Sequence, residues 1–219
     1  MRIVVVASGA VAPGDEAWLD GADVVIAADG GAAALDRLGR RPDRLVGDLD
    51  SADPALVERL EASGTRVDRH PADKEASDTE LAVHAAIAAG ADRVDLLGAT
   101  GGTRLDHELA NLLLLADPAF AGIEIQALAG RATARALHGG GELPLRGSVG
   151  DLVTLLPIGG DAHGVTTTGL RWALDGATLH LGGSRGLSNV VTAPRASVRL
   201  AEGVLLVVET ASTTGDHHP

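Results

Sequence analysis

Short apolar runs alternate with amphipathic stretches over about the first 125 residues. The runs are rich in Val, Ile and Leu and predict strands at 2–7, 23–28, 43–47, 65–70, 93–98 and 123–128. Between several of them apolar residues recur at helical spacing, which predicts helices at 31–39, 54–64, 77–90 and 105–116. This alternation predicts an α/β fold, a mostly parallel sheet with helices on both faces.

The pattern changes after about residue 130. Residues 139–150 are rich in turn-forming glycine, and the short apolar runs that follow show no useful helical period. Asp175-Gly176 is a strong signal for a hairpin turn. We therefore predict a small antiparallel β-sandwich or barrel. The expected organisation is an α/β domain at 1–128, an all-β domain at 129–210 and a disordered tail at 211–219.

Composition excludes several kinds of chemistry. The chain has no cysteine, which excludes disulfides, thiolate metal sites and a cysteine nucleophile. Its net charge of −12 argues against nonspecific binding to nucleic acid or to anionic membranes. The apolar stretch at the start is shorter than the roughly 7–15 residues of a secretory signal, and no run approaches the ~20 residues of a membrane span. We expect a soluble, cytoplasmic protein with no nucleic-acid and no membrane partner.

Acidic and glycine-rich segments follow the predicted strands. They are Asp29-Gly30-Gly31, Asp48-Leu49-Asp50-Ser51, 73–78 and 101–107. In an open α/β sheet, ligands bind beyond the carboxyl ends of the strands, so these segments should meet at one edge. Carboxylates gathered there would repel one another unless a cation neutralised them. Mg²⁺ prefers oxygen ligands and binds a few carboxylates together with substrate phosphates, so we expect Asp48 and Asp50 to flank a metal ion.

Glycines and basic residues at the same edge suit a polyphosphate. Gly30-Gly31 and Gly101-Gly102 would let the backbone approach phosphate closely. Lys74 is the single lysine beside seventeen arginines, which suggests a site where arginine would not serve. Lys74 and Arg104 would pair with phosphate oxygens. No Walker-type loop ending in Lys-Ser or Lys-Thr is present, so an ordinary P-loop kinase is not expected.

Each motif alone has a simpler interpretation. An isolated Asp-x-Asp is usually a helix cap or a solvated turn, the Gly pairs are ordinary turns, and His107 could be a helix-surface residue. Their common position after successive strands is what favours a metal–polyphosphate site.

The same residues resemble the thiamine pyrophosphokinase family. The matching segments occur in the family's order at 28–35, 42–51, 73–83, 98–115, 169–174 and 186–189. The resemblance implies that the hydroxyl of thiamine attacks the β-phosphorus of ATP, giving thiamine diphosphate and AMP. It also implies Mg²⁺ and a homodimer whose active sites combine the α/β domain of one subunit with the β domain of the other.

The resemblance further implies roles for individual residues. The metal ligands are Asp29, Asp48, Asp50 and Asp78. The catalytic set is Asp48, Asp50, Lys74, Asp78, Arg104 and Asp106, and either Asp78 or Asp106 could accept the hydroxyl proton. The ATP site comprises Asp29, Gly30, Gly31, Ser51, Gly102, Arg104 and His107. Ser188, Asn189 and Trp172 match the thiamine-binding segments; Trp172 could stack on the thiazolium, and a core or dimer-interface position is the preferred interpretation for it.

Other functions stay open at this point. The nearest is a pyrophosphokinase for another alcohol, such as a hydroxymethyl-pterin. A metal-dependent nucleotide-sugar glycosyltransferase would use Asp48 and Asp50 but leave Lys74, Asp78 and Asp106 without a role. A non-catalytic thiamine- or nucleotide-binding regulator is the third alternative.

Overall fold

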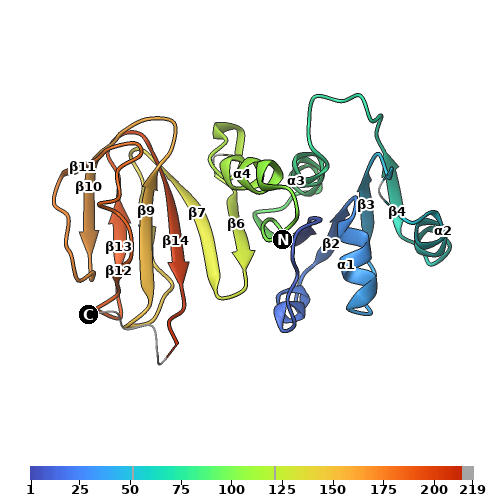
Figure 1. Cartoon of the computed structure of the whole chain (residues 1–219), viewed down its shortest axis with the longest axis horizontal. Coiled ribbons are helices and arrows are strands. Elements are labelled where there is room, and N and C mark those ends of the chain that lie inside the picture. Colours follow the sequence, from blue (N-terminus) through green and yellow to red (C-terminus); the bar gives the residue numbers. More distant parts are fainter. Residues whose placement is uncertain (51, 121, 214–219) are drawn as a thin grey trace. The chain divides into compact units, whose positions relative to one another are not determined.

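The computed structural model describes residues 1–50, 52–120 and 122–213. Ser51, expected at the ATP site, and residues 214–219 of the expected tail therefore lie outside the described residues. The chain divides into two compact units (Figure 1). The first is Met1–Leu114 with Ala119–Gly130, and the second is Leu115–Pro118 with Arg131–Pro219.

The first unit contains a parallel sheet. Its strands are β1 (Arg2–Val6), β2 (Val24–Ala28), β3 (Arg44–Gly47), β4 (Arg66–Arg69), β5 (Arg93–Leu97) and β6 (Glu124–Ala129). They lie in the order β6-β5-β1-β2-β3-β4, and each neighbouring pair is parallel. The prediction of a mostly parallel sheet from the apolar runs is confirmed.

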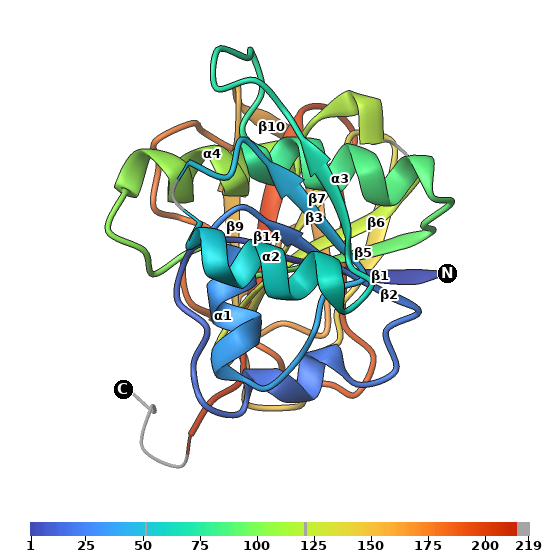
Figure 2. The ribbon, with the colours of Figure 1, turned by 90° about the vertical axis from the view of Figure 1, so that its right-hand side faces the viewer.

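Helices cover both faces of this sheet. They are α1 (Gly31–Arg37), α2 (Pro54–Ala62), α3 (Asp78–Ala88) and α4 (Leu105–Leu114), with short 3₁₀ helices η1 (Asp15–Leu19) and η2 (Pro118–Phe120). Figure 2 shows α3 and α4 above the strands of this unit and α1 below them. Val4 and Val6 of β1 pack into one cluster with Leu35 of α1 and Leu60 of α2. Each fully buried side chain of this kind contributes roughly 1.5–3 kcal/mol.

The strand order creates a switch point between β1 and β5. The chain builds outward from β1 through β2 and β3 to β4, then returns to place β5 on the other side of β1. At such a point the loops after the two strands diverge and leave a crevice beyond their carboxyl ends. The fold therefore sets the position of a ligand site before any particular side chain is considered.

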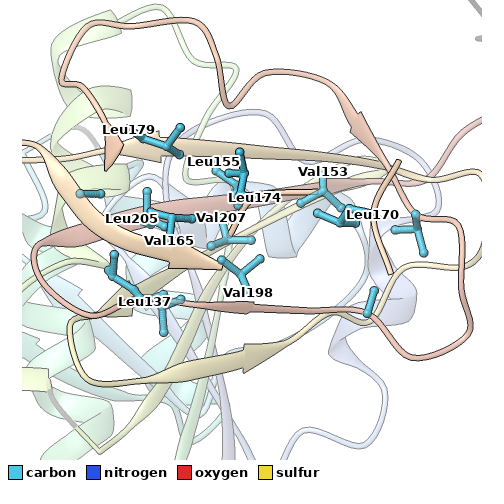
Figure 3. Packing of buried hydrophobic residues seen from close by; sticks show 14 residues of the cluster. Leu137, Val153, Leu155, Val165, Leu170, Leu174, Leu179, Val198, Leu205 and Val207 are labelled. Atoms are coloured by element: carbon cyan, nitrogen blue, oxygen red, sulfur yellow. The ribbon is translucent and has the colours of Figure 1, made fainter. Parts of the chain in front are cut away.

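The second unit is an antiparallel β-sandwich, as predicted. One sheet has the order β12-β9-β14-β7 and the other β11-β10-β13-β8. The strands are β7 (Ala132–His138), β8 (Glu142–Pro144), β9 (Leu152–Pro157), β10 (Ala162–Thr168), β11 (Ala177–Leu179), β12 (Asn189–Val190), β13 (Ser197–Arg199) and β14 (Val204–Thr210). Figure 3 shows the aliphatic core, in which Leu155 and Val207 of the first sheet pack with Val165 and Val198 of the second.

Two local expectations in this unit were wrong. Asp175-Gly176 does not form a two-residue hairpin turn, because the whole of 169–176 connects β10 to β11. Strand β7 was not expected, because three of its seven residues are Ala and only Thr133 is β-branched, which gives a weak strand signal. It is held in place by pairing along its full length with β14. No helix in the described part of the chain is both long and apolar enough to cross a membrane.

Candidate active site

Three carboxylates converge beyond the strands of the parallel sheet. Asp29 follows β2, Asp48 follows β3 and Asp78 is the first residue of α3. One carboxylate oxygen from each lies within 4.8 Å of the other two. Asp29 is buried and the other two are partly buried, so their mutual repulsion is only weakly screened by water. The predicted gathering of acids at one sheet edge is therefore present in the folded chain.

Lys74 is bound between two of these carboxylates. Its Nζ lies 2.7 Å from Asp48 Oδ2 and 2.8 Å from Asp78 Oδ1, and its side chain is only 14% exposed. The hydrogen bond from Lys74, with one from the Asp50 amide, holds the pKa of Asp48 below its ordinary value. Burial alone would lower the pKa of Lys74, but its bonds to Asp48 and Asp78 outweigh burial and raise it. Three carboxylates and one ammonium leave two negative charges, which one divalent cation would neutralise.

Asp50, expected as the fourth metal ligand, does not join this cluster. It is exposed, and its backbone N–H donates to Asp48 Oδ1 at 3.3 Å. Leu49 between the two acids has a positive φ of 62°. The side chains of Asp48 and Asp50 also interact, which helps to lower the pKa of Asp48. The expectation that Asp48 and Asp50 flank one ion therefore stays a prediction.

Gly47 leaves the space in which the carboxylates meet. A Cβ at this position would lie 3.1 Å from Asp29 Cβ and 3.2 Å from Asp78 Oδ1. We expect Gly47→Ala to push these side chains apart, weaken the binding of Mn²⁺ and Mg²⁺, and cost about 1–3 kcal/mol of stability by overpacking. Isothermal titration with each metal would measure the change. Gly39→Ala is a suitable control, since Gly39 also has a positive φ (65°, against 157° at Gly47) and nothing lies within 4 Å of its Cβ position. Equal metal affinity in both variants would contradict the prediction.

A pocket of about 280 Å³ opens beside the acidic cluster, at the switch point of the sheet. Asp29 and Asp78 line it together with Arg104 and His107, as does Gly102. The prediction that the loops after β2 and β5 share a site with the start of α3 is thus realised in space.

Sequence reasoning missed part of this pocket. Ser8 and Gly9 follow β1 and line it, and Asn111 of α4 lines it while donating from Nδ2 to the Ala99 carbonyl at 2.9 Å. The Gly9 amide donates to the Gly98 carbonyl at 2.8 Å, and a Cβ on Gly9 would lie 2.3 Å from that oxygen. The Ser-Gly after the first strand was the available signal, because it occupies the same sheet edge as the other segments.

The Gly30-Gly31 pair has a packing role in the structure. A Cβ on Gly31 would lie 1.9 Å from the Val6 carbonyl oxygen, and one on Gly30 would lie 2.9 Å from Ser8 Oγ. Neither glycine lines the pocket. Close packing of α1 on β1 therefore explains this pair, and the expectation that its backbone approaches phosphate stays a prediction.

Arg104 and Asp106 form an ion pair at the pocket mouth. Arg104 Nε donates to Asp106 Oδ1 at 2.9 Å and a second guanidinium nitrogen donates to Oδ2 at 2.5 Å, with both side chains well exposed. The bond from Arg104 holds the pKa of Asp106 far below its ordinary value. A carboxylate with a lowered pKa is a weaker base, so this arrangement disfavours Asp106 as the acceptor of a hydroxyl proton.

The residues expected to bind thiamine occur in the second unit. Trp172 is 56% exposed, so a core position for it was wrong, and the dimer-interface position stays a prediction. Ser188 is exposed with a positive φ of 54°, and its amide donates to Thr154 Oγ1 at 3.0 Å. Asn189 is buried and hydrogen-bonds to the backbone of Trp172. The two matching segments of this unit, 169–174 and 186–189, are therefore in contact.

Backbone strain coincides with these segments. Among the described residues, the non-glycine positions with positive φ are Asp29, Leu49 and Ser188. Such conformations cost about 1–3 kcal/mol each and persist at sites where the surrounding structure imposes them. All three belong to segments that the sequence had singled out.

Fold and site together define a class: a two-unit α/β protein with an acidic pocket at the carboxyl edge of its parallel sheet, followed along the chain by an antiparallel β-sandwich. Family models identify the chain more closely. The thiamin pyrophosphokinase catalytic domain matches residues 16–127, and the thiamin pyrophosphokinase vitamin B1 binding domain matches residues 142–205. The chain belongs to the thiamine pyrophosphokinase family.

Individual relatives agree with this assignment. The thiamine pyrophosphokinase of Bacillus subtilis is 27% identical over 184 residues, which cover 84% of this chain and 85% of that protein. Thiamine pyrophosphokinase 3 of Oryza sativa subsp. japonica is 32% identical over 204 residues, covering 78% and 72%. The crystal structure of the Bacillus subtilis protein superimposes with a TM-score of 0.86 at 25% identity, covering 97% of this chain and 100% of that one.

Proposed function

We propose that the chain transfers a pyrophosphoryl group from ATP to the hydroxyl of thiamine, giving thiamine diphosphate and AMP. The observation that carries this proposal is the acidic cluster beside a pocket at the switch point, in a chain that matches both domains of the family. The comparisons give no support to a pterin pyrophosphokinase or to a nucleotide-sugar glycosyltransferase. Since ATP is the donor, we place the reaction in the cytoplasm.

The three clustered carboxylates suit a divalent cation of the Mg²⁺ type. Asp29, Asp48 and Asp78 offer only oxygen ligands, close enough together to share one ion. Three protein ligands would leave coordination positions for phosphate oxygens, the usual arrangement at a Mg²⁺ nucleotide site. When bound, the ion would neutralise charge on the polyphosphate and polarise the β-phosphoryl group.

Side chains of the site would bind the phosphates, orient the attacking hydroxyl and accept its proton. Lys74 and Arg104 bind phosphate oxygens and hold the β-phosphorus in line with the attacking hydroxyl. The thiamine oxygen forms a bond to this phosphorus as the bond to the bridging oxygen between the α- and β-phosphates breaks, and AMP leaves. Asp78 and Asp106 are the two candidates to accept the hydroxyl proton: Asp78 lines the pocket and is bound by Lys74, and Asp106 is bound by Arg104.

A direct assay tests the reaction. Purified protein is incubated with ATP, Mg²⁺ and thiamine, and AMP and thiamine diphosphate are separated by chromatography. Equal amounts of the two products are expected, with neither formed without thiamine or in excess EDTA. A hydroxymethyl-pterin in place of thiamine is the control substrate. AMP formed only with the pterin would overturn the proposal in favour of the alternative alcohol, and ATP binding without turnover would indicate a regulator.

We further propose that the chain works as a homodimer, the arrangement that the family resemblance implies. Leu105, Leu109 and Leu113 lie four residues apart on α4 and are 68%, 53% and 54% exposed. They form one apolar face of the helix that also contributes His107, Glu108 and Asn111 to the pocket. A contiguous exposed apolar face is typical of an interaction surface. In the second unit, Trp172 and Leu187 are likewise exposed.

Leu109→Asp is expected to convert the dimer to monomers and to lower activity in parallel, because it places a charge in an apolar contact. Sedimentation equilibrium would measure the association. Ala62→Asp adds the same charge to the exposed surface of α2 and should leave the assembly unchanged. A monomeric parent protein with full activity, or a dimer that survives Leu109→Asp, would contradict this proposal.

A further inference from the structure

We infer that Asn189 is a positioning residue: its side chain fixes the backbone of Trp172 so that the exposed indole ring forms a platform for thiamine. The sequence had grouped Asn189 with the residues that contact thiamine. This inference rests on the proposed function, and it assigns Asn189 a different part in it.

The hydrogen bonds of Asn189 are directed at Trp172. Asn189 Oδ1 accepts from the Trp172 N–H at 3.1 Å, and Asn189 Nδ2 donates to the Trp172 carbonyl at 2.8 Å. Oδ1 also accepts from the Val190 N–H at 2.9 Å. A side-chain amide has two donor and two acceptor positions, so three of the four are in use. Asn189 is 7% exposed, which leaves little of it available to a ligand.

The register of the surrounding strands explains why an amide is required. Leu170 bridges antiparallel to Val191, and this register places Trp172 opposite Asn189. The Arg171 N–H donates to the Val190 carbonyl at 2.9 Å on the same ladder. The backbone of Asn189 is already paired with Val153 of β9. Its side chain therefore takes the place of a backbone partner for Trp172, because an amide carries the same donor and acceptor as a peptide group.

The backbone of Trp172 is held by hydrogen bonds, whereas its indole ring is exposed. It is 56% exposed, although an indole of this size would ordinarily be mostly buried. The guanidinium carbon of Arg171 lies 5.4 Å from the ring centroid, so one face of the ring already accepts a cation. A cationic heteroaromatic ligand is the chemical class that such a surface would bind, and the thiazolium of thiamine belongs to it.

The composition of the chain makes the inference testable by fluorescence. Tyrosine is absent and the only tryptophans are Trp18 and Trp172, so Trp18→Phe leaves Trp172 as the single indole emitter. In this background we would introduce Asn189→Asp, which keeps the size but replaces the donor to the Trp172 carbonyl by an oxygen. Asn189→Ala, which removes both hydrogen bonds to the Trp172 backbone without adding charge, is the second variant. Thr166→Val is the matched control, since it removes an acceptor for the Gly176 N–H at the other end of the same connection.

Three measurements are made on each variant: time-resolved anisotropy of Trp172 without ligand, quenching of its emission by thiamine, and KM for thiamine and for ATP. We expect both Asn189 variants to increase the mobility of Trp172. The thiamine quenching midpoint and KM should rise about tenfold, the effect of one lost hydrogen bond at the upper end of its usual value. KM for ATP should stay unchanged, and the control should behave as the Trp18→Phe parent.

The possible results separate the inference from the proposed function. Weaker thiamine binding with unchanged Trp172 mobility would mean that Asn189 contacts thiamine directly, and would overturn the inference alone. Unchanged thiamine binding in both Asn189 variants would also overturn the inference and leave the proposed function standing. Absence of any thiamine quenching and turnover in the parent would overturn the proposed function and the inference with it.

Discussion

Asp48→Asn is expected to lower kcat/KM by about 10²–10³-fold, the loss typical of removing one charged group that stabilises a transition state. The substitution keeps the shape of the side chain but removes one of the three clustered carboxylates and weakens the partner of Lys74. We therefore expect weaker metal binding and a less well positioned Lys74 ammonium. Steady-state kinetics at saturating Mg²⁺, with titration of Mn²⁺ binding, would measure the two effects.

Two further variants make this prediction specific. Asp50→Asn should have a clearly smaller effect, because the Asp50 carboxylate is outside the cluster. Asp36→Asn, at an exposed position of α1 where Asp36 pairs with Arg59, should behave as the parent. Equal losses for Asp48→Asn and Asp50→Asn would support the prediction that these two acids flank one ion.

The thermal stability of Asp48→Asn is also informative. The pKa of Asp48 is lowered in the folded chain, so its charged form stabilises the fold at pH values above its ordinary pKa. This contribution is lost as the pH falls through the lowered pKa. Relief of repulsion among the acids would instead predict a more stable variant. We therefore expect Tm of Asp48→Asn at neutral pH to be no higher than that of the parent, in the absence of metal.

Lys74→Met is expected to lower turnover by about 10²-fold, through misplacement of the polyphosphate, and yet to strengthen the binding of bare Mg²⁺. The ammonium occupies the cluster at 2.7 and 2.8 Å from two of its carboxylates. Its removal changes the charge of the site from two negative to three negative, so a divalent cation should bind about tenfold or more tightly. Calorimetric titration of Mg²⁺ without nucleotide would measure the affinity.

Controls separate this local effect from a change in overall charge. Arg59→Met removes one positive charge from the exposed surface of the same unit and should leave Mg²⁺ affinity unchanged. Lys74→Arg keeps the charge but replaces a compact ammonium by a larger, planar guanidinium group. We therefore expect low turnover without the gain in Mg²⁺ affinity. Weaker Mg²⁺ binding by Lys74→Met would show that the ammonium supports the metal site and does not compete with it.

The sequence by itself determined the architecture. Short apolar runs and helical patterns located the six parallel strands and their helices, because strands buried on both faces are continuously apolar and half-buried helices repeat apolar residues at helical spacing. The switch to short runs and glycine turns marked the β-sandwich. Parallel strands bring their carboxyl ends to one edge, so Asp29, Asp48 and Asp78 could be expected together from their positions after successive elements. The lone lysine was also a real signal, since Lys74 lies among these acids.

Only the tertiary structure decided which of the neighbouring polar residues meet. Asp48 and Asp50 are two residues apart, yet the group of three clustered carboxylates includes Asp48 and not Asp50, and sequence spacing does not specify the positive φ of Leu49 between them. Gly31 and Gly47 look like loop glycines until the atoms that fill their Cβ positions are known. The pairing of Asn189 with Trp172 depends on register between segments distant in the chain. Periodicity fixes elements because it is local, whereas these contacts depend on backbone conformation and on strands packed from far along the chain.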